Sequence, residues 1–193
     1  MSGFSVYLLL GFQHIADLTA FDHIVFIVAL CAVYEIRLWK NILLLVTAFT
    51  LGHSMTLAAA TLGILRLPTD LIEFLIPVTI LFTCVINIVK SDKLAHRKIH
   101  YNYAMALFFG LIHGMGFSNY LRALLGREMS IWKPLLAFNT GLEIGQLLIV
   151  GVSLCCATLL LKGFRIRHQD WNLVVSGVCA GMAIMLMIQA KFW

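Results

Sequence analysis

The sequence predicts an all-α fold, a polytopic transmembrane helical bundle of about six spans plus a short N-terminal interfacial or re-entrant helix. Composition carries this prediction, because 61% of the residues are hydrophobic and 12% are charged, with a mean hydropathy of +0.95. Soluble domains have about 25% charged residues, so this chain lacks the charges for a water-facing surface. Apolar runs of about 20 residues, the length that crosses a bilayer, recur along the chain. Residues 1–193 are therefore expected to form a single integral membrane domain.

The apolar segments follow one another in order. Residues 4–15 form a run of about twelve, which is too short to cross the membrane, so we expect it to be interfacial or re-entrant. Pro68 ends one of the later spans, and Pro77 predicts a kink inside the next. Residues 90–100 are the most charged stretch and should lie in solvent. The six predicted spans are residues 21–34, 41–65, 69–89, 101–125, 134–161 and 171–189.

The positive charges predict an orientation in the membrane. The formal net charge is +5, but the Lys and Arg residues lie in short loops, and no basic stretch is interleaved with aromatic residues. We therefore expect contacts with lipid headgroups and no nucleic acid. The positive-inside rule makes the side with more cations cytoplasmic, so both termini should lie outside. The two sides hold nine and five cations: Arg37, Lys40, Lys90, Lys93, Arg97, Lys98, Lys162, Arg165 and Arg167 against Arg66, Arg122, Arg127, Lys133 and Lys191.

A few polar side chains interrupt the spans. Burying such a group in a membrane is costly unless it has partners, which makes these residues candidates for function. Asp22 and His23 fall near the outer start of one span, while His53, His113 and Glu143 fall near the middle of three others. These similar depths, at about 1.5 Å of rise per residue, predict that the side chains meet. The remaining histidines lie in predicted loops and are not candidates: His96, His100 and His168.

Glycines near these positions predict close helix packing. The segment FNTGLEIGQ places Asn139, Glu143 and Gln146 on one helix face. Glycines spaced by four residues let helix backbones approach closely, which short side chains need in order to converge on one ion. Two such pairs flank the candidates: Gly110 with Gly114, and Gly141 with Gly145.

Imidazole nitrogens and carboxylate oxygens together predict a site for one transition-metal ion of the nickel, cobalt or zinc type. The five cysteines lie in apolar runs without a CxxC pair, so thiolate ligands are not expected. Glu143 is an alternative to Asp22 as a ligand or as an orienting group. The expected metal ligands are His14, Asp22, His23, His53 and His113. The expected supporting or pathway residues are Ser54, Asn139, Glu143 and Gln146, and no catalytic residue is predicted.

Each candidate taken alone also has an ordinary structural explanation. A lone intramembrane histidine is commonly a packing or hydrogen-bonding residue, and Asp22 is a suitable helix N-cap. The Ser54 hydroxyl is able to bond back to its own helix. The joint pattern, several such residues at one depth on different spans, favours the metal site over these separate explanations.

Four sequence blocks resemble the HupE/UreJ family of bacterial membrane proteins. The block HIADLTAFDHIVF carries His14, then Asp22 and His23 after a seven-residue spacer, and FFGLIHGMGF carries His113. TLGHSMTL and FNTGLEIGQ also resemble family blocks, so the resemblance covers most of the chain. Gly110 stands where nickel-permease members often carry a further histidine. The resemblance implies nickel or cobalt uptake, associated in some members with hydrogenase or urease maturation, and residence in the bacterial cytoplasmic (inner) membrane.

Three function classes fit these residues. The first is a transition-metal permease with an intramembrane His/carboxylate site. The alternative is an intramembrane zinc-dependent hydrolase acting on a lipid or lipid-linked substrate, since catalytic zinc has three protein ligands and an open position. A continuous polar path would favour the permease, and a closed-bottom cavity the hydrolase. A metal sensor or assembly subunit is disfavoured by the short loops. Expected partners are membrane lipids and the metal ion, with a homo-oligomer left open.

Overall fold

The computed structural model describes residues 3–19, 21–89, 99–125 and 131–190, and the regular structure within these ranges is helical. The charged stretch predicted at residues 90–100 lies mostly outside the described residues. The elements are α1 (Gly3–Ile15), α2 (Asp22–Cys31), the 3-10 helix η1 (Ile36–Leu38), α3 (Trp39–Thr61), α4 (Thr69–Val89), α5 (Ile99–Gly116), α6 (Ser118–Leu125), α7 (Trp132–Phe164) and α8 (His168–Gln189).

Four helices are long and apolar enough to cross a membrane, namely α3, α4, α7 and α8. The helices α5 and α6 meet at a bend of 49° and together form a fifth candidate span. The predicted all-α, polytopic bundle is therefore confirmed, with about the predicted number of spans. Two shorter apolar helices remain, α1 with 13 residues and α2 with 10. At about 1.5 Å per residue, α2 is about 15 Å long, whereas the hydrocarbon core is about 30 Å thick.

The bend between α5 and α6 interrupts a segment that the sequence predicts as one span. Gly116 ends α5, and Ser118 begins α6. The Ser118 hydroxyl donates a hydrogen bond of 2.8 Å to the Met115 carbonyl, which the end of the helix leaves without a helical partner. The bend turns Phe117 inward, where its ring packs against His14 at 4.1 Å between centroids.

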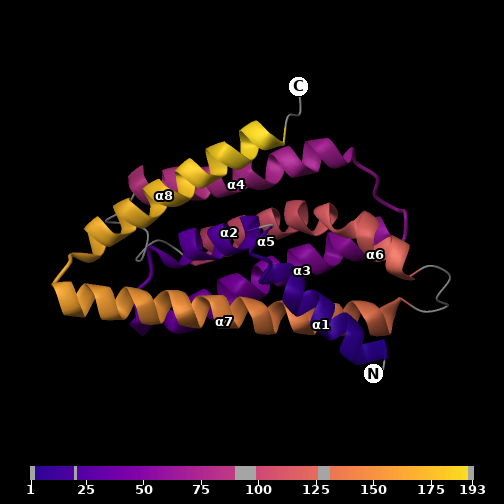
Figure 1. Ribbon diagram of the computed structural model, residues 1–193, viewed down its shortest axis with the longest axis horizontal. Helices are drawn as coiled ribbons and strands as arrows, with labels where there is room; N and C mark the ends of the chain where they lie inside the picture. The colour runs from indigo at the N-terminus through magenta and orange to yellow at the C-terminus, as the bar shows by residue number, and fades with distance from the viewer. Residues whose placement is uncertain (1–2, 20, 90–98, 126–130, 191–193) are drawn as a thin grey trace.

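The helices pack in three pairs. Figure 1 shows α4 with α8 on one side of the molecule, α3 with α5 in the middle beside α2, and α7 with α1 on the other side. Large fully buried side chains, among them Phe26, Phe49 and Phe138, fill the interior between these pairs. Large apolar side chains on the outer faces of α7 and α8 are exposed, as expected for helices that contact lipid.

Glycines set the close approach of two of these pairs. A Cβ at Gly114 would collide with the His53 carbonyl oxygen, and one at Gly110 with the Phe49 carbonyl oxygen. A Cβ at Gly141 would likewise collide with the backbone of Leu8. The glycine pairs singled out from the sequence are therefore the points where α5 touches α3 and α7 touches α1.

Candidate metal centre

Histidines from three helices meet near one end of the bundle. His14 lies in the last turn of α1, His23 is the second residue of α2, and His53 lies in the second half of α3. The segment between α1 and α2 is only six residues long, so it keeps His23 close to His14. The Gly114 contact holds the His53 turn of α3 against α5.

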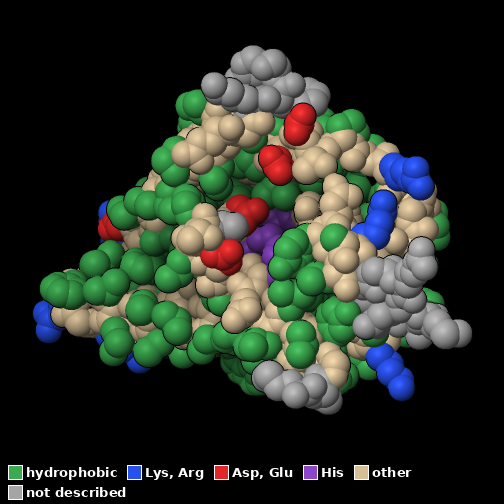
Figure 2. Space-filling view, turned by 45° about the vertical axis from the view of Figure 1, so that its right-hand side comes forward, with side chains coloured by type: hydrophobic (Ala, Val, Ile, Leu, Met, Phe, Trp, Pro, Cys, Tyr) green, Lys and Arg blue, Asp and Glu red, His purple; other side chains and the backbone are tan. Residues whose placement is uncertain are grey.

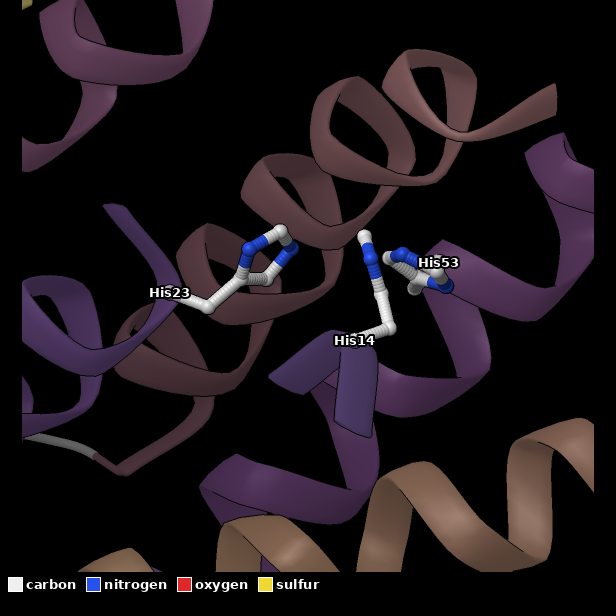
Figure 3. Close-up of side chains that lie close together, drawn as sticks. All are labelled: His14, His23 and His53. Carbon is white, nitrogen blue, oxygen red and sulfur yellow. The ribbon is translucent and has the colours of Figure 1, made fainter. Parts of the chain in front are cut away.

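The three imidazoles form a compact cluster. Each residue offers one ring nitrogen, and these nitrogens lie within 4.8 Å of one another. The ring centroids are 4.8 Å apart for His14 and His23, 6.0 Å for His14 and His53, and 6.1 Å for His23 and His53. Figure 3 shows the three rings pointing toward one another from separate helices. In tetrahedral ligation with bonds of about 2.0–2.1 Å, ligand nitrogens are about 3.4 Å apart, so the three rings would have to close further around an ion.

Asp22 fixes the orientation of His23. One carboxylate oxygen, Oδ1, lies 3.0 Å from His23 Nδ1 and accepts a 2.9 Å hydrogen bond from the His23 backbone N–H. A carboxylate only accepts, so the proton of the neutral ring is on Nδ1 and the lone pair is on Nε2. His23 Nε2 is buried and has no hydrogen-bond partner in the described ranges of the chain. This carboxylate–imidazole pairing is the arrangement that prepares a histidine to bind a metal.

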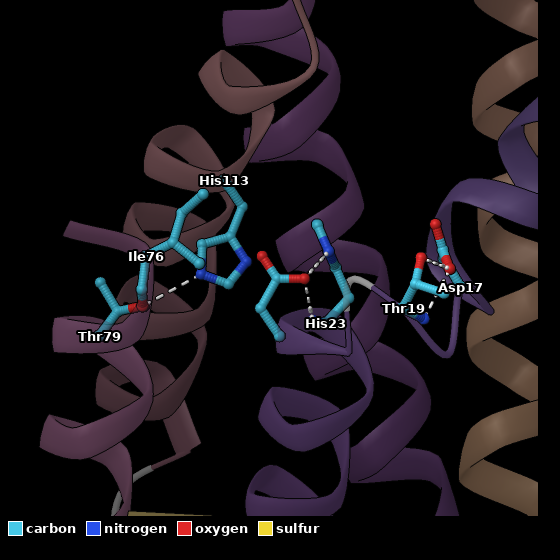
Figure 4. Close-up of polar contacts among 7 residues, drawn as sticks. Asp17, Thr19, His23, Ile76, Thr79 and His113 are labelled. Carbon is cyan, nitrogen blue, oxygen red and sulfur yellow. Dashed lines mark hydrogen bonds and ion pairs between the residues drawn. The ribbon is translucent and has the colours of Figure 1, made fainter. Parts of the chain in front are cut away.

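A second set of contacts fixes His113, which lies on α5 beside the cluster. Its ring is 5.2 Å from that of His23, and its Nε2 is 3.0 Å from the Thr79 hydroxyl (Figure 4). The same hydroxyl donates to the Ile76 carbonyl at 2.7 Å, so it is left to accept from His113. The His113 proton is therefore on Nε2, and Nδ1 carries the lone pair. That nitrogen is also buried without a partner.

Orphaned nitrogens are the distinguishing property of this site. Buried polar atoms normally have hydrogen-bond partners, and those that lack them require an explanation. Within the part of the chain that the structure describes, both nitrogens of His53 lack a hydrogen-bond partner, as does Nε2 of His14, in addition to Nε2 of His23 and Nδ1 of His113. His53 is fully buried, and His113 is 1% exposed. Four imidazoles that present unshared nitrogens inside one small volume fit a cation with nitrogen ligands better than they fit ordinary packing.

Aromatic rings enclose the cluster and exclude water from part of it. Phe49 lies 5.1 Å from His113 and 6.2 Å from His53 between ring centroids, and Phe26 lies 5.3 Å from His113. Phe117 packs on the other side against His14. Electrostatic interactions strengthen in such a low-dielectric setting, so a bound cation would interact strongly with the Asp22 carboxylate.

The cluster is reachable from the surface at this end of the bundle. A hollow of about 710 Å³ is lined by His14, Asp17, Phe117 and Tyr120 among others. A neighbouring hollow of about 260 Å³ is lined in part by Asp22 and Glu73. Figure 2 shows imidazole on the floor of an opening bordered by acidic side chains. Carboxylates around such an opening raise the local concentration of cations.

Polar side chains continue from the cluster along the contact between α3 and α7. The Thr50 hydroxyl donates to Gln146 Oε1 at 2.6 Å, and the Thr47 hydroxyl donates to Glu143 Oε1 at 3.3 Å. Gln146 is fully buried, and none of the described residues forms a hydrogen bond with its Nε2. Thr50 and Thr47 lie one and two turns before His53 on α3, so these contacts lead away from the surface hollow.

The structure brings together some of the predicted site residues and separates others. His14, His23 and His53 form the compact group, with His113 and Asp22 in direct contact with it. Glu143 and Gln146 form hydrogen bonds with threonines of α3, and Asn139 Oδ1 is buried with no hydrogen-bond partner among the residues that the structure describes. For Ser54 the ordinary structural explanation agrees with the geometry, since its hydroxyl donates to the Thr50 carbonyl at 2.6 Å.

The residues that orient and enclose the histidines were not predicted from the sequence. Thr79 fixes the His113 tautomer, yet hydroxyl residues in apolar helices usually bond to their own backbone, so nothing in the surrounding residues marked it. The same holds for Thr50, which does bond to the Val46 carbonyl as well as to Gln146. Phe117 does not differ in the sequence from the apolar run around it. Its contact with His14 follows from the bend between α5 and α6.

The fold and the site define a polytopic membrane protein with a buried, partly open cluster of histidines. The family model described as "HupE / UreJ protein" matches residues 1–193, so the chain belongs to the HupE/UreJ family. The resemblance noted from the sequence blocks is thereby confirmed over the whole chain. This family is associated with the transport of nickel or cobalt or with accessory functions. Neither the curated proteins nor the solved structures contain a match to this chain.

Proposed function

We propose that this protein is a transition-metal permease whose cargo, a nickel-, cobalt- or zinc-like divalent ion, binds at His14, His23 and His53. The observation that carries the proposal is the convergence of these three imidazoles, with nitrogens within 4.8 Å of one another, below an acidic opening. Imidazole nitrogen suits these metals, and the family association favours nickel or cobalt among them.

Asp22 and His113 complete the proposed site. Asp22 holds His23 with its free nitrogen toward the cluster and contributes one negative charge beside a divalent cation. His113 offers Nδ1 as a fourth nitrogen, because its other nitrogen is held by Thr79. Three or four neutral nitrogens with a single carboxylate give an ion enough ligands to leave water without neutralising it fully. An ion that is bound but only partly neutralised can also be released, as transport requires.

The polar contacts between α3 and α7 favour transport over hydrolysis. Thr50, Gln146, Thr47 and Glu143 extend the polar lining beyond the histidines, in the direction away from the opening. A hydrolase needs only a cavity that ends at its metal. The Ser54 hydroxyl, which a hydrolase would direct at its substrate, donates to the Thr50 carbonyl instead. In this proposal the bacterial cytoplasmic membrane is the location, with the acidic opening on the outer side.

The test is metal uptake into vesicles that contain the purified full-length protein. Wild-type protein should accumulate nickel, cobalt or zinc in a saturable manner, and His53→Ala should abolish accumulation because His53 contributes a ligand from the centre of the cluster. Met55→Ala is the matched control, since Met55 is an exposed residue of α3, the helix that carries His53. Circular dichroism and gel filtration of both variants establish that each is folded.

Two results would count against the proposal. If wild-type vesicles accumulate none of the three metals, the protein is not a permease for them. Stoichiometric metal in the purified protein without uptake would instead support the zinc-dependent hydrolase. Equal uptake by wild type and His53→Ala would remove the histidine cluster from the transport path.

A further inference from the structure

A second hollow lies at the end of the bundle opposite the histidines. It has a volume of about 300 Å³ and lies where the end of α7 meets the start of α8 and the segment between α2 and α3. The helix α2 starts at Asp22 beside the metal centre and ends at Cys31, shortly before this hollow. In Figure 1 the turn from α7 to α8 lies at the left-hand end of the molecule, far from α6. The hollow is therefore separate from the proposed metal path.

Positive charge dominates the polar part of this hollow. Arg37 and Lys162 both line it and are exposed, and within the described part of the chain neither forms an ion pair. Glu35 also lines the hollow, so the two cations outnumber the acid. His168 contributes a third nitrogen-bearing side chain, whose Nε2 is buried and has no hydrogen-bond partner among the described residues. Three such side chains around one space fit a phosphate group.

The rest of the wall is apolar and continues onto the membrane-facing surface. Leu154, Leu161 and Ile166 line the hollow, and the neighbouring side chain of Phe164 is 74% exposed. Lys40 lies over the Trp39 ring at 5.8 Å from its centroid, and Trp39 itself is 49% exposed. Tryptophan and lysine in such positions mark the level of the lipid headgroups. The hollow thus has a cationic part at headgroup depth and an apolar part at chain depth.

We infer that this hollow binds the phosphate of an anionic phospholipid, with Arg37, Lys162 and His168 around the phosphate and the acyl chains along Leu154, Leu161 and Ile166. Basic pockets between transmembrane helices bind anionic lipid headgroups in this way. The inference does not depend on metal transport. It agrees with the orientation predicted from the Lys and Arg residues, which makes this end cytoplasmic.

A free phosphate ion would bind to the same cations but would not contact the apolar wall. The two sources are therefore separable by comparing lipids with inorganic phosphate. Each Lys or Arg near a membrane surface contributes roughly a factor of five to the affinity for anionic lipid. Removing both cations should lower the affinity by roughly 25-fold.

The experiment is native mass spectrometry of the delipidated full-length protein in detergent. The protein is titrated separately with phosphatidylglycerol, with phosphatidylcholine of identical acyl chains, and with inorganic phosphate. The double variant Arg37→Gln/Lys162→Gln is compared with the control Arg66→Gln/Lys133→Gln, which makes the same charge change at exposed positions elsewhere. Wild type and control should retain one phosphatidylglycerol in preference to phosphatidylcholine, and the first variant should lose that preference. All proteins are first checked for helical content and monodispersity.

Three outcomes would overturn the inference. Equal retention of the two lipids by wild type would show that the hollow does not select the anionic headgroup. Equal loss in the two double variants would assign the effect to total charge and not to this hollow. Binding of inorganic phosphate with no preference for phosphatidylglycerol would assign the cations to a soluble anion.

Discussion

Replacing Asp22 tests whether the histidine cluster is organised to bind a metal. The Asp22 carboxylate oxygen lies 3.0 Å from His23 Nδ1, which leaves Nε2 with the lone pair that a metal requires. The substitution Asp22→Asn would keep a hydrogen-bond acceptor but lose the negative charge. The substitution Asp22→Ala would remove the acceptor and leave the His23 tautomer free. Asp22→Asn should therefore weaken metal binding less than Asp22→Ala does.

The magnitude follows from the role of the hydrogen bond. Removing a group that orients a metal-binding histidine typically lowers metal affinity by about 10- to 100-fold, or about 1.4 to 2.8 kcal/mol. A hydrogen bond to a charged group is worth roughly twice a neutral one, so Asp22→Asn should lie near the lower limit. Asp22→Ala should lie near the upper limit, because it also removes the acceptor for the His23 backbone N–H.

The assay is competitive titration of nickel, cobalt and zinc against a chromogenic chelator, using purified protein at a fixed pH. Asp170→Asn is the matched control, since Asp170 pairs with Arg167 at the exposed start of α8. Unfolding midpoints of all variants separate a loss of affinity from a loss of fold. The reasoning is refuted if both Asp22 variants bind metal within about twofold of wild type, because the structural role predicts at least a roughly tenfold loss.

Helix packing and ligand orientation give two further tests. Gly114→Ala should lower the free energy of unfolding by about 1–3 kcal/mol, because the new Cβ meets the His53 carbonyl, whereas Gly177→Ala on α8 meets nothing within 4 Å; thermal unfolding compares the two. Thr79→Val should cost about 1–3 kcal/mol in the same assay and weaken metal binding, since His113 Nε2 loses its partner; unchanged stability and affinity would contradict this.

Much of the helical organisation could be predicted from hydropathy alone. The predicted span at residues 69–89 coincides with α4 (Thr69–Val89), and the short segment at residues 4–15 corresponds to α1 (Gly3–Ile15). These predictions succeed because the cost of placing polar groups in hydrocarbon acts on each segment independently. The bend after Gly116 was not predictable in this way, since it changes direction without changing hydropathy.

The candidate site, too, could be predicted from the sequence only in part. The sequence by itself indicated that His23, His53, His113 and Glu143 lie at similar depths, because depth follows from the number of residues along each helix. Only the tertiary structure decided which of them share one space and placed Glu143 beside Thr47 instead. Neighbours across the bundle depend on how each helix is rotated and on which helix packs against it. That arrangement is set by contacts between distant segments, such as the Gly114 turn against His53, which the local sequence does not encode.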